Sequence, residues 1–132
     1  MRSDTLTLVI VCLTQYCAFM STDEVLDSHI QELRRGTVVV ACLRILQEPE
    51  YGYRLLERLE EAGFAVEANT LYPLLRRLEK QSLLTSDWNT DEPRPRKYYT
   101  TSAAGRAVAD AVMADWDRLA KALDALSVKG RK

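Results

Sequence analysis

The sequence predicts a mainly α protein with a small β-hairpin: a winged helix-turn-helix followed by a long C-terminal dimerisation helix. Three observations support this fold class. Two short amphipathic segments lie close together at 51–62 and 70–84, as in a helix-turn-helix. Two β-prone segments follow at 84–88 and 97–101, separated by a loop that contains two prolines. An alanine-rich segment with helical periodicity then covers 102–127.

Length and composition narrow the class of protein. A chain of 132 residues that is 47% hydrophobic and 28% charged is typical of one soluble domain with a modest core. The net charge of −1 excludes a basic surface overall, so any nucleic-acid binding must rely on local patches. Cys12, Cys17 and Cys42 form no CxxC pair, which favours reduced thiols in the cytoplasm. We expect no metal and no cofactor.

The apolar run from Leu6 to Met20 has three interpretations. It is shorter than the roughly 20 residues of a membrane helix, and no clear cleavage motif follows it. The run can be an extension upstream of a natural start at Met20. It can also be an added strand or helix, or a membrane or export segment. The extension is favoured because Ser21 and Glu24 form a capping box directly after Met20. The expected parts are an apolar extension (1–20), a winged-helix domain (21–101), a dimerisation helix (102–127) and a frayed tail (128–132).

The first two helices are expected at Thr22–Gln47 and Tyr51–Ala62. Gly36 lies in the middle of the first helix and indicates either close packing or a break. Pro49 should end that helix, and Gly63 is a natural cap for the second. The apolar face of the first helix is expected to consist of Val25, Leu33, Val40, Leu43 and Leu46.

The third helix, in 70–84, has two different faces. Its apolar stripe has the spacing i, i+3, i+4, i+7 and consists of Leu71, Leu74, Leu75 and Leu78. The other face carries Tyr72, Arg76, Glu79 and Lys80, with Arg77 on its flank. We expect Asn69 or Thr70 to cap the helix and Pro73 to lie in its first turn. Arginine can pair bidentately with guanine and lysine neutralises phosphate, so this face is typical of a DNA-reading helix; a solvated surface is the alternative.

The predicted hairpin carries a cationic tip. Arg94, Arg96 and Lys97 suit contact with the minor groove or the DNA backbone, although a solubilising loop is the alternative. Since Tyr98 and Tyr99 alternate along a strand, one of them should face the core. Trp88 is expected to pack beneath the hairpin.

The C-terminal helix predicts a partner helix. Its apolar residues recur in alternating steps of three and four, which is the 3.5-residue repeat of a helix-pairing seam. A core this small cannot cover the seam, so a second copy of the chain is the expected cover. The predicted seam starts at Ala109, and its dimerisation residues are Val112, Trp116, Leu119, Leu123 and Leu126.

Taken together, these segments resemble the PadR family of transcriptional regulators. The resemblance rests on RRGTVVVACLRIL (34–46), YGYRLLERLEEAG (51–63), TLYPLLRRLEKQSLL (70–84) and RKYYTTSAAGR (96–106), in this order. It implies a homodimeric repressor of the branch with a single C-terminal helix. Such a dimer would place two recognition helices in successive major grooves of a pseudo-palindromic operator in double-stranded DNA.

The resemblance also implies which residues form the sites. The expected DNA-binding residues are Asn69, Thr70, Tyr72, Arg76, Arg77, Lys80, Arg94, Arg96 and Lys97. Family members often sense small aromatic molecules near the dimer interface, so Trp116 either stacks on such an effector or packs in the dimer. Three positions depart from the family pattern. Asn69 and Ser82 replace common glycines, which leaves the helix end at Ser82 in question, and Thr101 replaces an apolar residue, which predicts loose packing there.

Three other functions compete with this interpretation. The near-neutral net charge favours a winged helix that binds protein, and an anchor at Leu6–Met20 would make a membrane-tethered regulator. An enzyme is disfavoured, because His29 is the only histidine and has no organised Ser or Cys partner. We expect His29 to lie on the surface.

Overall fold

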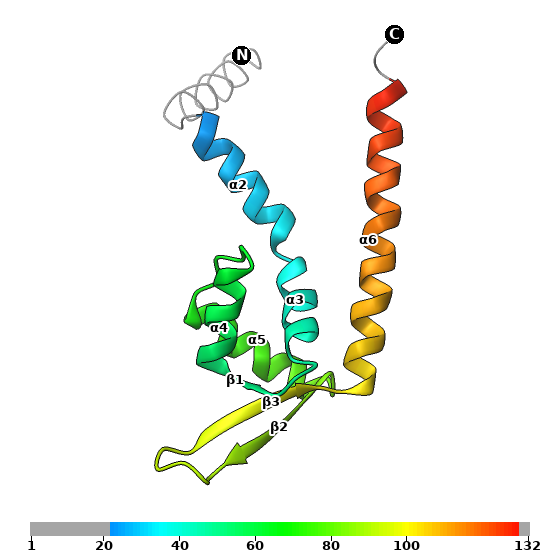
Figure 1. Cartoon of the computed structure of the whole chain (residues 1–132). Helices are drawn as coiled ribbons and strands as arrows, with labels where there is room; N and C mark the ends of the chain where they lie inside the picture. The colour runs from blue at the N-terminus through cyan, green and yellow to red at the C-terminus, as the bar shows by residue number, and fades with distance from the viewer. Residues whose placement is uncertain (1–21, 130–132) are drawn as a thin grey trace, which may run out of the picture. The chain divides into compact units, whose positions relative to one another are not determined.

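The computed structural model describes residues 22–129. The capping residue Ser21, the apolar run Leu6–Met20 and the last three residues lie outside this range, so the expectations for them stay predictions. The chain divides into two units between Thr37 and Val38. Figure 1 shows the helices α2 to α6 and the strands β1 to β3 along the chain, and the sheet belongs to the second unit. Within residues 22–129, no helix has the combination of length and hydropathy that crossing a bilayer requires.

The single helix predicted for 22–47 is wrong, because the chain forms two helices there. They are α2 (Thr22–Arg34) and α3 (Thr37–Ile45). A side chain at Gly36 would meet no atom within 4 Å, so the glycine marks a break and not a close contact. The expected apolar face is also divided. Leu33 is exposed on α2, which buries none of its residues, whereas Val40 belongs to the core through α3. His29 is exposed, as predicted.

The second predicted helix is α4 (Gly52–Glu61), and Gly63 ends it. Gly63 has a φ of +93°, a left-handed conformation that glycine adopts without steric cost. The Gly63 amide donates to the carbonyl of Glu60 at 3.0 Å, and the Phe64 amide donates to that of Leu59 at 2.8 Å. This pair of bonds is a Schellman motif, which satisfies the last carbonyls of the helix.

The third helix, α5 (Ala68–Lys80), begins earlier than predicted. Glu67 is its N-cap, so neither Asn69 nor Thr70 caps it, and both lie in the first turn. Pro73 consequently lies inside the helix and not in its first turn. The earlier start adds the two polar residues to the helix itself, on the exposed side.

The end of α5 is well formed although Ser82 replaces the usual glycine. Ser82 has a φ of 63° and donates its amide to the carbonyl of Glu79 at 3.0 Å. The Leu83 amide donates to the carbonyl of Leu78 at 2.9 Å, which completes the same Schellman motif as in α4. The departure from glycine therefore does not change the helix end.

A three-stranded antiparallel sheet follows the order β1-β3-β2 (Figure 1). The predicted hairpin is β2 (Leu84–Asn89) and β3 (Arg96–Thr101). The additional strand β1 (Glu50–Tyr51) was not predicted, and Tyr51 therefore belongs to a strand and not to the second helix. It pairs with β3 through Glu50 and Tyr99, and through Tyr51 and Tyr98.

The aromatic residues of the hairpin are arranged partly as predicted. Tyr99 is buried and Tyr98 is half-buried, so one of the two tyrosines faces the core. The prediction for Trp88 is wrong, because its side chain is 65% exposed. Trp88 pairs with Lys97 one position before the end of β2, in the half of the hairpin that extends past the buried residues Leu84 and Tyr99.

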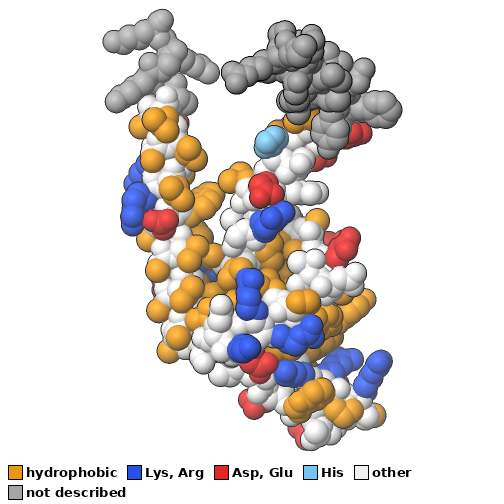
Figure 2. Space-filling view, turned by 180° about the vertical axis from the view of Figure 1, so that it is seen from behind, with side chains coloured by type: hydrophobic (Ala, Val, Ile, Leu, Met, Phe, Trp, Pro, Cys, Tyr) orange, Lys and Arg blue, Asp and Glu red, His pale blue; other side chains and the backbone are white. Residues whose placement is uncertain are grey.

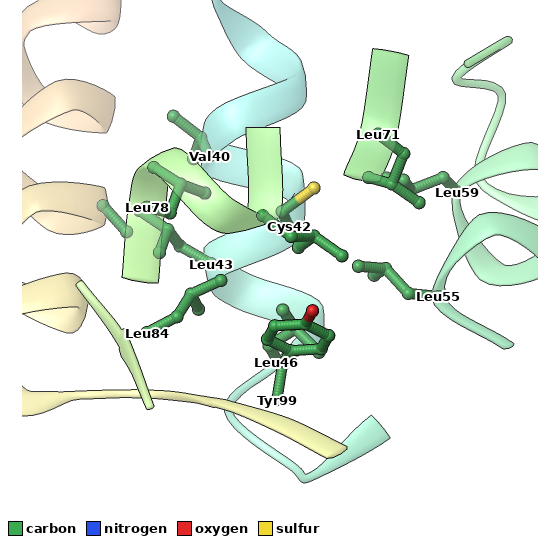
Figure 3. Packing of buried hydrophobic residues seen from close by; sticks show 12 residues of the cluster. Val40, Cys42, Leu43, Leu46, Leu55, Leu59, Leu71, Leu78, Leu84 and Tyr99 are labelled. Carbon is green, nitrogen blue, oxygen red and sulfur yellow. The ribbon is translucent and has the colours of Figure 1, made fainter. Parts of the chain in front are cut away.

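The core lies among α3, α4, α5 and the sheet. Figure 3 shows leucines of the helices that point toward one another above the ring of Tyr99. The prediction of loose packing at Thr101 is wrong. This side chain is only 4% exposed, and its hydroxyl donates to the carbonyl of Leu43 at 2.7 Å. The buried core consists of Val40, Cys42, Leu43, Leu46, Leu55, Leu59, Leu71, Leu75, Leu78, Leu84, Tyr99 and Ala109.

The last helix, α6 (Ala103–Lys129), leaves the sheet directly after β3 (Figure 1). Ser102 caps it: the Ser102 hydroxyl accepts from the Gly105 amide at 3.1 Å and donates to the carbonyl of Ser82 at 2.6 Å. Of the predicted seam, only Ala109 is buried in the core. The exposed fraction then rises along the helix, from 43% at Val112 to 70% at Leu126. The described part of the chain therefore leaves most of the seam uncovered.

Candidate nucleic-acid interface

The exposed face of α5 carries most of the predicted DNA-binding residues. Leu71, Leu75 and Leu78 anchor the helix in the core, so the opposite face must point to solvent. This exposed face consists of Asn69, Thr70, Tyr72, Arg76, Arg77 and Lys80. Among the described residues, Arg76, Arg77 and Lys80 form no ion pair, so their charges are available to an anionic partner.

Tyr72 connects α5 to the start of α4. A Cβ atom added to Gly52 would lie 2.6 Å from Cε1 of the Tyr72 ring. A side chain at this position would displace the Tyr72 ring, because the ring lies directly against the backbone of Gly52. The Tyr72 side chain is nevertheless 39% exposed, so it can pack between the two helices and still reach a partner.

A groove of about 570 Å³ lies between the starts of the two helices and the hairpin. It brings together four of the predicted residues, Tyr72, Arg94, Arg96 and Lys97. The other five, Asn69, Thr70, Arg76, Arg77 and Lys80, do not line the groove and lie along α5. The remaining lining residues are Tyr51, Gly52, Tyr53 and Tyr99. Phenolic hydroxyls and cations together are suited to phosphate oxygens.

Arg96 is held in position by its neighbours. Its guanidinium lies 4.4 Å from the centre of the Tyr51 ring, and its Nε lies 3.7 Å from a carboxylate oxygen of Glu92. Tyr51 in turn meets the Tyr98 ring edge to face, with the ring centres 5.6 Å apart. Arg94, by contrast, is exposed and forms no ion pair within residues 22–129.

Lys97 is held by an acidic residue of α5. Its Nζ lies 3.2 Å from Oε1 of Glu79, while the Ser86 hydroxyl donates to Oε2 of the same carboxylate. The hydrogen bond from Ser86, together with Lys97, lowers the pKa of Glu79. The hydrogen bond to Glu79 raises the pKa of Lys97, so both charged forms are favoured.

Sequence reasoning missed the contacts of Glu79. The periodicity of the helix predicts a solvent-facing side chain for Glu79, although the residue lies next to Leu78 and four positions after Leu75, both buried. That position at the edge of the buried stripe is a signal for a flanking contact. The partners could not be identified without the register of the hairpin.

Acidic residues neutralise a cation of α4, the helix that precedes α5. On α4, Arg54 lies within 4 Å of three glutamates, Glu50, Glu57 and Glu61, so its charge is neutralised locally. Figure 2 shows Lys and Arg side chains in the lower part of the view, where the hairpin lies, with Asp and Glu side chains among them. The candidate interface is thus a local patch, as the net charge of −1 requires.

Comparisons with known proteins agree with this geometry. The model of the transcriptional regulator PadR-like family matches residues 42–111. The chain is 35% identical over 79 residues to the transcriptional regulator Rv3488 of Mycobacterium tuberculosis, which covers 59% of this chain and 74% of that protein.

Solved structures match over a larger share of the chain. A PadR family transcriptional regulator from Eggerthella lenta is 47% identical with a TM-score of 0.75, and the match covers 79% of this chain and 93% of that one. A PadR-like transcription factor from Bacteroides fragilis is 30% identical with a TM-score of 0.63, covering 75% and 98%.

Proposed function

Because this chain belongs to the PadR-like family of transcriptional regulators, we propose that it is a homodimeric repressor that binds a pseudo-palindromic operator in double-stranded DNA. The observation that carries the proposal is the exposed face of α5, where Arg76, Arg77 and Lys80 have no ion-pair partner within residues 22–129. The cationic groove beside it supplies the second contact region. We expect the protein to act in the cytoplasm, where a bacterial chromosome is accessible.

The two regions have different tasks in this proposal. The start of α5, with Asn69, Thr70 and Tyr72, enters the major groove, as recognition helices do. Arg76, Arg77 and Lys80 contact base edges and phosphates along the same helix. Arg94 and Arg96 of the hairpin contact the backbone or the minor groove, while Lys97 lies in the same groove and is held by Glu79.

Dimerisation rests on the uncovered stripe of α6. Val112, Trp116, Leu119, Leu123 and Leu126 lie exposed at the spacing of a helix-pairing seam. A second copy of the chain would bury the stripe and present a second α5. Recognition helices about 34 Å apart fit successive major grooves.

Regulation by a small molecule would act through the same interface. Trp116 is 48% exposed on the stripe and offers a flat apolar surface, either to the partner helix or to a small aromatic effector. An effector that binds better to a dimer with a different helix spacing shifts the population away from the DNA-binding form. Release of the operator follows from that difference in affinity.

The proposal is tested by selecting genomic fragments with the purified protein and measuring binding by fluorescence anisotropy at several salt concentrations. Arg76→Ala combined with Arg77→Ala should weaken binding and make the slope of log K against log salt shallower by about two units for each chain, and therefore by about four units for the dimer. Arg35→Ala combined with Arg106→Ala removes two exposed arginines elsewhere and should leave the slope unchanged. An unchanged slope in the first variant removes α5 from the interface. If no fragment is enriched even at low salt, the protein-binding alternative replaces the proposal.

A further inference from the structure

We propose that Glu79 is a specificity-determining residue for DNA binding. In this inference, its carboxylate holds Lys97 at the base of the hairpin and keeps that cation from attracting phosphates of any sequence. The inference rests on the proposed DNA contact of α5 and the hairpin. It gives a role in DNA binding to a negative charge that lies on the same helix as Arg76, Arg77 and Lys80.

The carboxylate of Glu79 joins three elements. It projects from α5, one oxygen accepts from the Ser86 hydroxyl on β2, and the other lies 3.2 Å from the Lys97 ammonium on β3. Ser86 pairs with Tyr99, two positions from Lys97, so the two partners are diagonal neighbours on the sheet face toward α5. One side chain therefore fixes the hairpin to the helix that carries Arg76 and Lys80.

Lys97 is held from a second side as well. Its Nζ lies 5.2 Å from the centre of the Tyr99 ring, which is itself buried in the core. The Glu79 and Lys97 side chains are each 31% exposed, so water and a phosphate group can reach them. The ammonium is thus accessible but already paired, in contrast to Arg76 and Arg77.

This arrangement affects two kinds of DNA binding differently. Non-specific binding depends on the number of phosphates that cations neutralise, and a lysine already paired with a carboxylate contributes little. Operator binding depends on the placement of α5 and the hairpin relative to each other, which the contacts of Glu79 preserve. The carboxylate therefore lowers the affinity for random sequence more than the affinity for the operator.

Glu79→Gln is the informative variant because it removes the charge and little else. The glutamine oxygen can still accept from Ser86, whereas the attraction to Lys97 is lost. Each released lysine should make the salt slope on a scrambled duplex steeper by about one unit, which is about an eightfold gain in affinity per chain at 0.1 M salt. The proposed dimer releases two lysines, so its slope should become steeper by about two units. Since the operator complex gains less, the ratio of the two affinities should fall.

The experiment measures anisotropy of the full chain with a selected operator fragment and a scrambled duplex, over a salt series. Lys97→Met alone should have the same salt slope on the scrambled duplex as the wild type, because the paired lysine contributes little there. The double variant Glu79→Gln, Lys97→Met should also have the wild-type slope, because it lacks the lysine that Glu79→Gln releases. Asp87→Asn is the matched control: it removes an exposed charge of β2 that pairs with no lysine in the described residues, and should leave the slope unchanged.

Several results would overturn the inference. If Glu79→Gln does not change the salt slope on the scrambled duplex, the inference is wrong. If Glu79→Gln lowers the affinity for both duplexes equally, Glu79 is only a structural contact. A shallower slope for Lys97→Met would show that Lys97 already binds phosphate in the wild type. If Asp87→Asn changes the slope as much as Glu79→Gln does, the effect comes from the net charge of the protein and not from Glu79. If the wild type binds neither duplex, both the proposed function and the inference are wrong. If the wild type binds the operator but one of the results above is found, only the inference is wrong.

Discussion

The hydroxyl of Thr101 donates to the backbone carbonyl of Leu43 at 2.7 Å, and so joins the end of the hairpin to α3. The backbone makes a parallel connection, because the Thr101 amide donates to the carbonyl of Leu46 at 2.8 Å. Both bonds lie inside the molecule, where an unpaired carbonyl is costly. A threonine at a position that favours apolar residues is thus accommodated by a carbonyl at the end of the neighbouring helix.

Thr101→Val should reduce the free energy of unfolding by about 1 kcal/mol, because it keeps the shape of the side chain and removes the donor to Leu43. Thermal denaturation followed by circular dichroism should show a melting temperature a few degrees lower. Thr100→Val, one residue earlier in β3 and half-buried, is the control and should change the stability by less than about 0.5 kcal/mol. Equal stabilities of the two variants would show that the buried bond is unimportant.

Gly105→Ala should be the more damaging of two glycine substitutions. A Cβ atom at Gly105 would lie 2.2 Å from the carbonyl oxygen of Leu83, and backbone cannot move aside as a flexible side chain can. We expect a loss of about 2–3 kcal/mol in chemical denaturation. At Gly36 the same substitution meets no atom within 4 Å and should be tolerated. A Gly105→Ala protein as stable as Gly36→Ala would contradict the close approach of α6 to Leu83.

The thiol of Cys42 should be protected in the folded protein. Burial raises its pKa from 9.0 to about 12, so the reactive thiolate forms mainly after unfolding. As the pH rises, the thiol loses its proton in the unfolded chain before it does so in the folded protein. The contribution of the buried thiol to the free energy of unfolding is therefore complete below pH 9.0 and is lost as the pH rises toward 12. In a Cys12→Ser, Cys17→Ser protein, labelling by a thiol reagent at pH 8 should follow the unfolding curve in denaturant. Rapid labelling without denaturant would place Cys42 at the surface.

Much of the fold could be predicted because hydrophobic periodicity determines which faces are buried. The stripe of Leu71, Leu75 and Leu78 specified both the existence and the orientation of α5, and hence the exposure of Arg76 and Arg77. The hairpin followed from two β-prone segments around a proline-containing loop. The seam of α6 was also evident, although its coverage by a second copy stays a prediction.

The remaining features depend on contacts between distant segments. Strand β1 has only two residues, and its pairing with β3 is not expressed in any local pattern. Trp88 was expected to be buried because it is large and apolar, but the hairpin extends past the core there. The role of Glu79 depends on Ser86 and Lys97, which only the register of the hairpin brings to the same carboxylate.

The central claim is that two chains associate through α6 and together present two α5 helices to DNA. Sedimentation equilibrium of the wild type at micromolar concentration tests it most directly, alongside Leu119→Asp combined with Leu123→Asp, two exposed positions of the stripe. We predict a mass twice the 15.0 kDa of the chain for the wild type. The variant should sediment as a folded monomer and lose operator binding. A wild type that sediments as a monomer, or a variant that remains a dimer, would contradict the account.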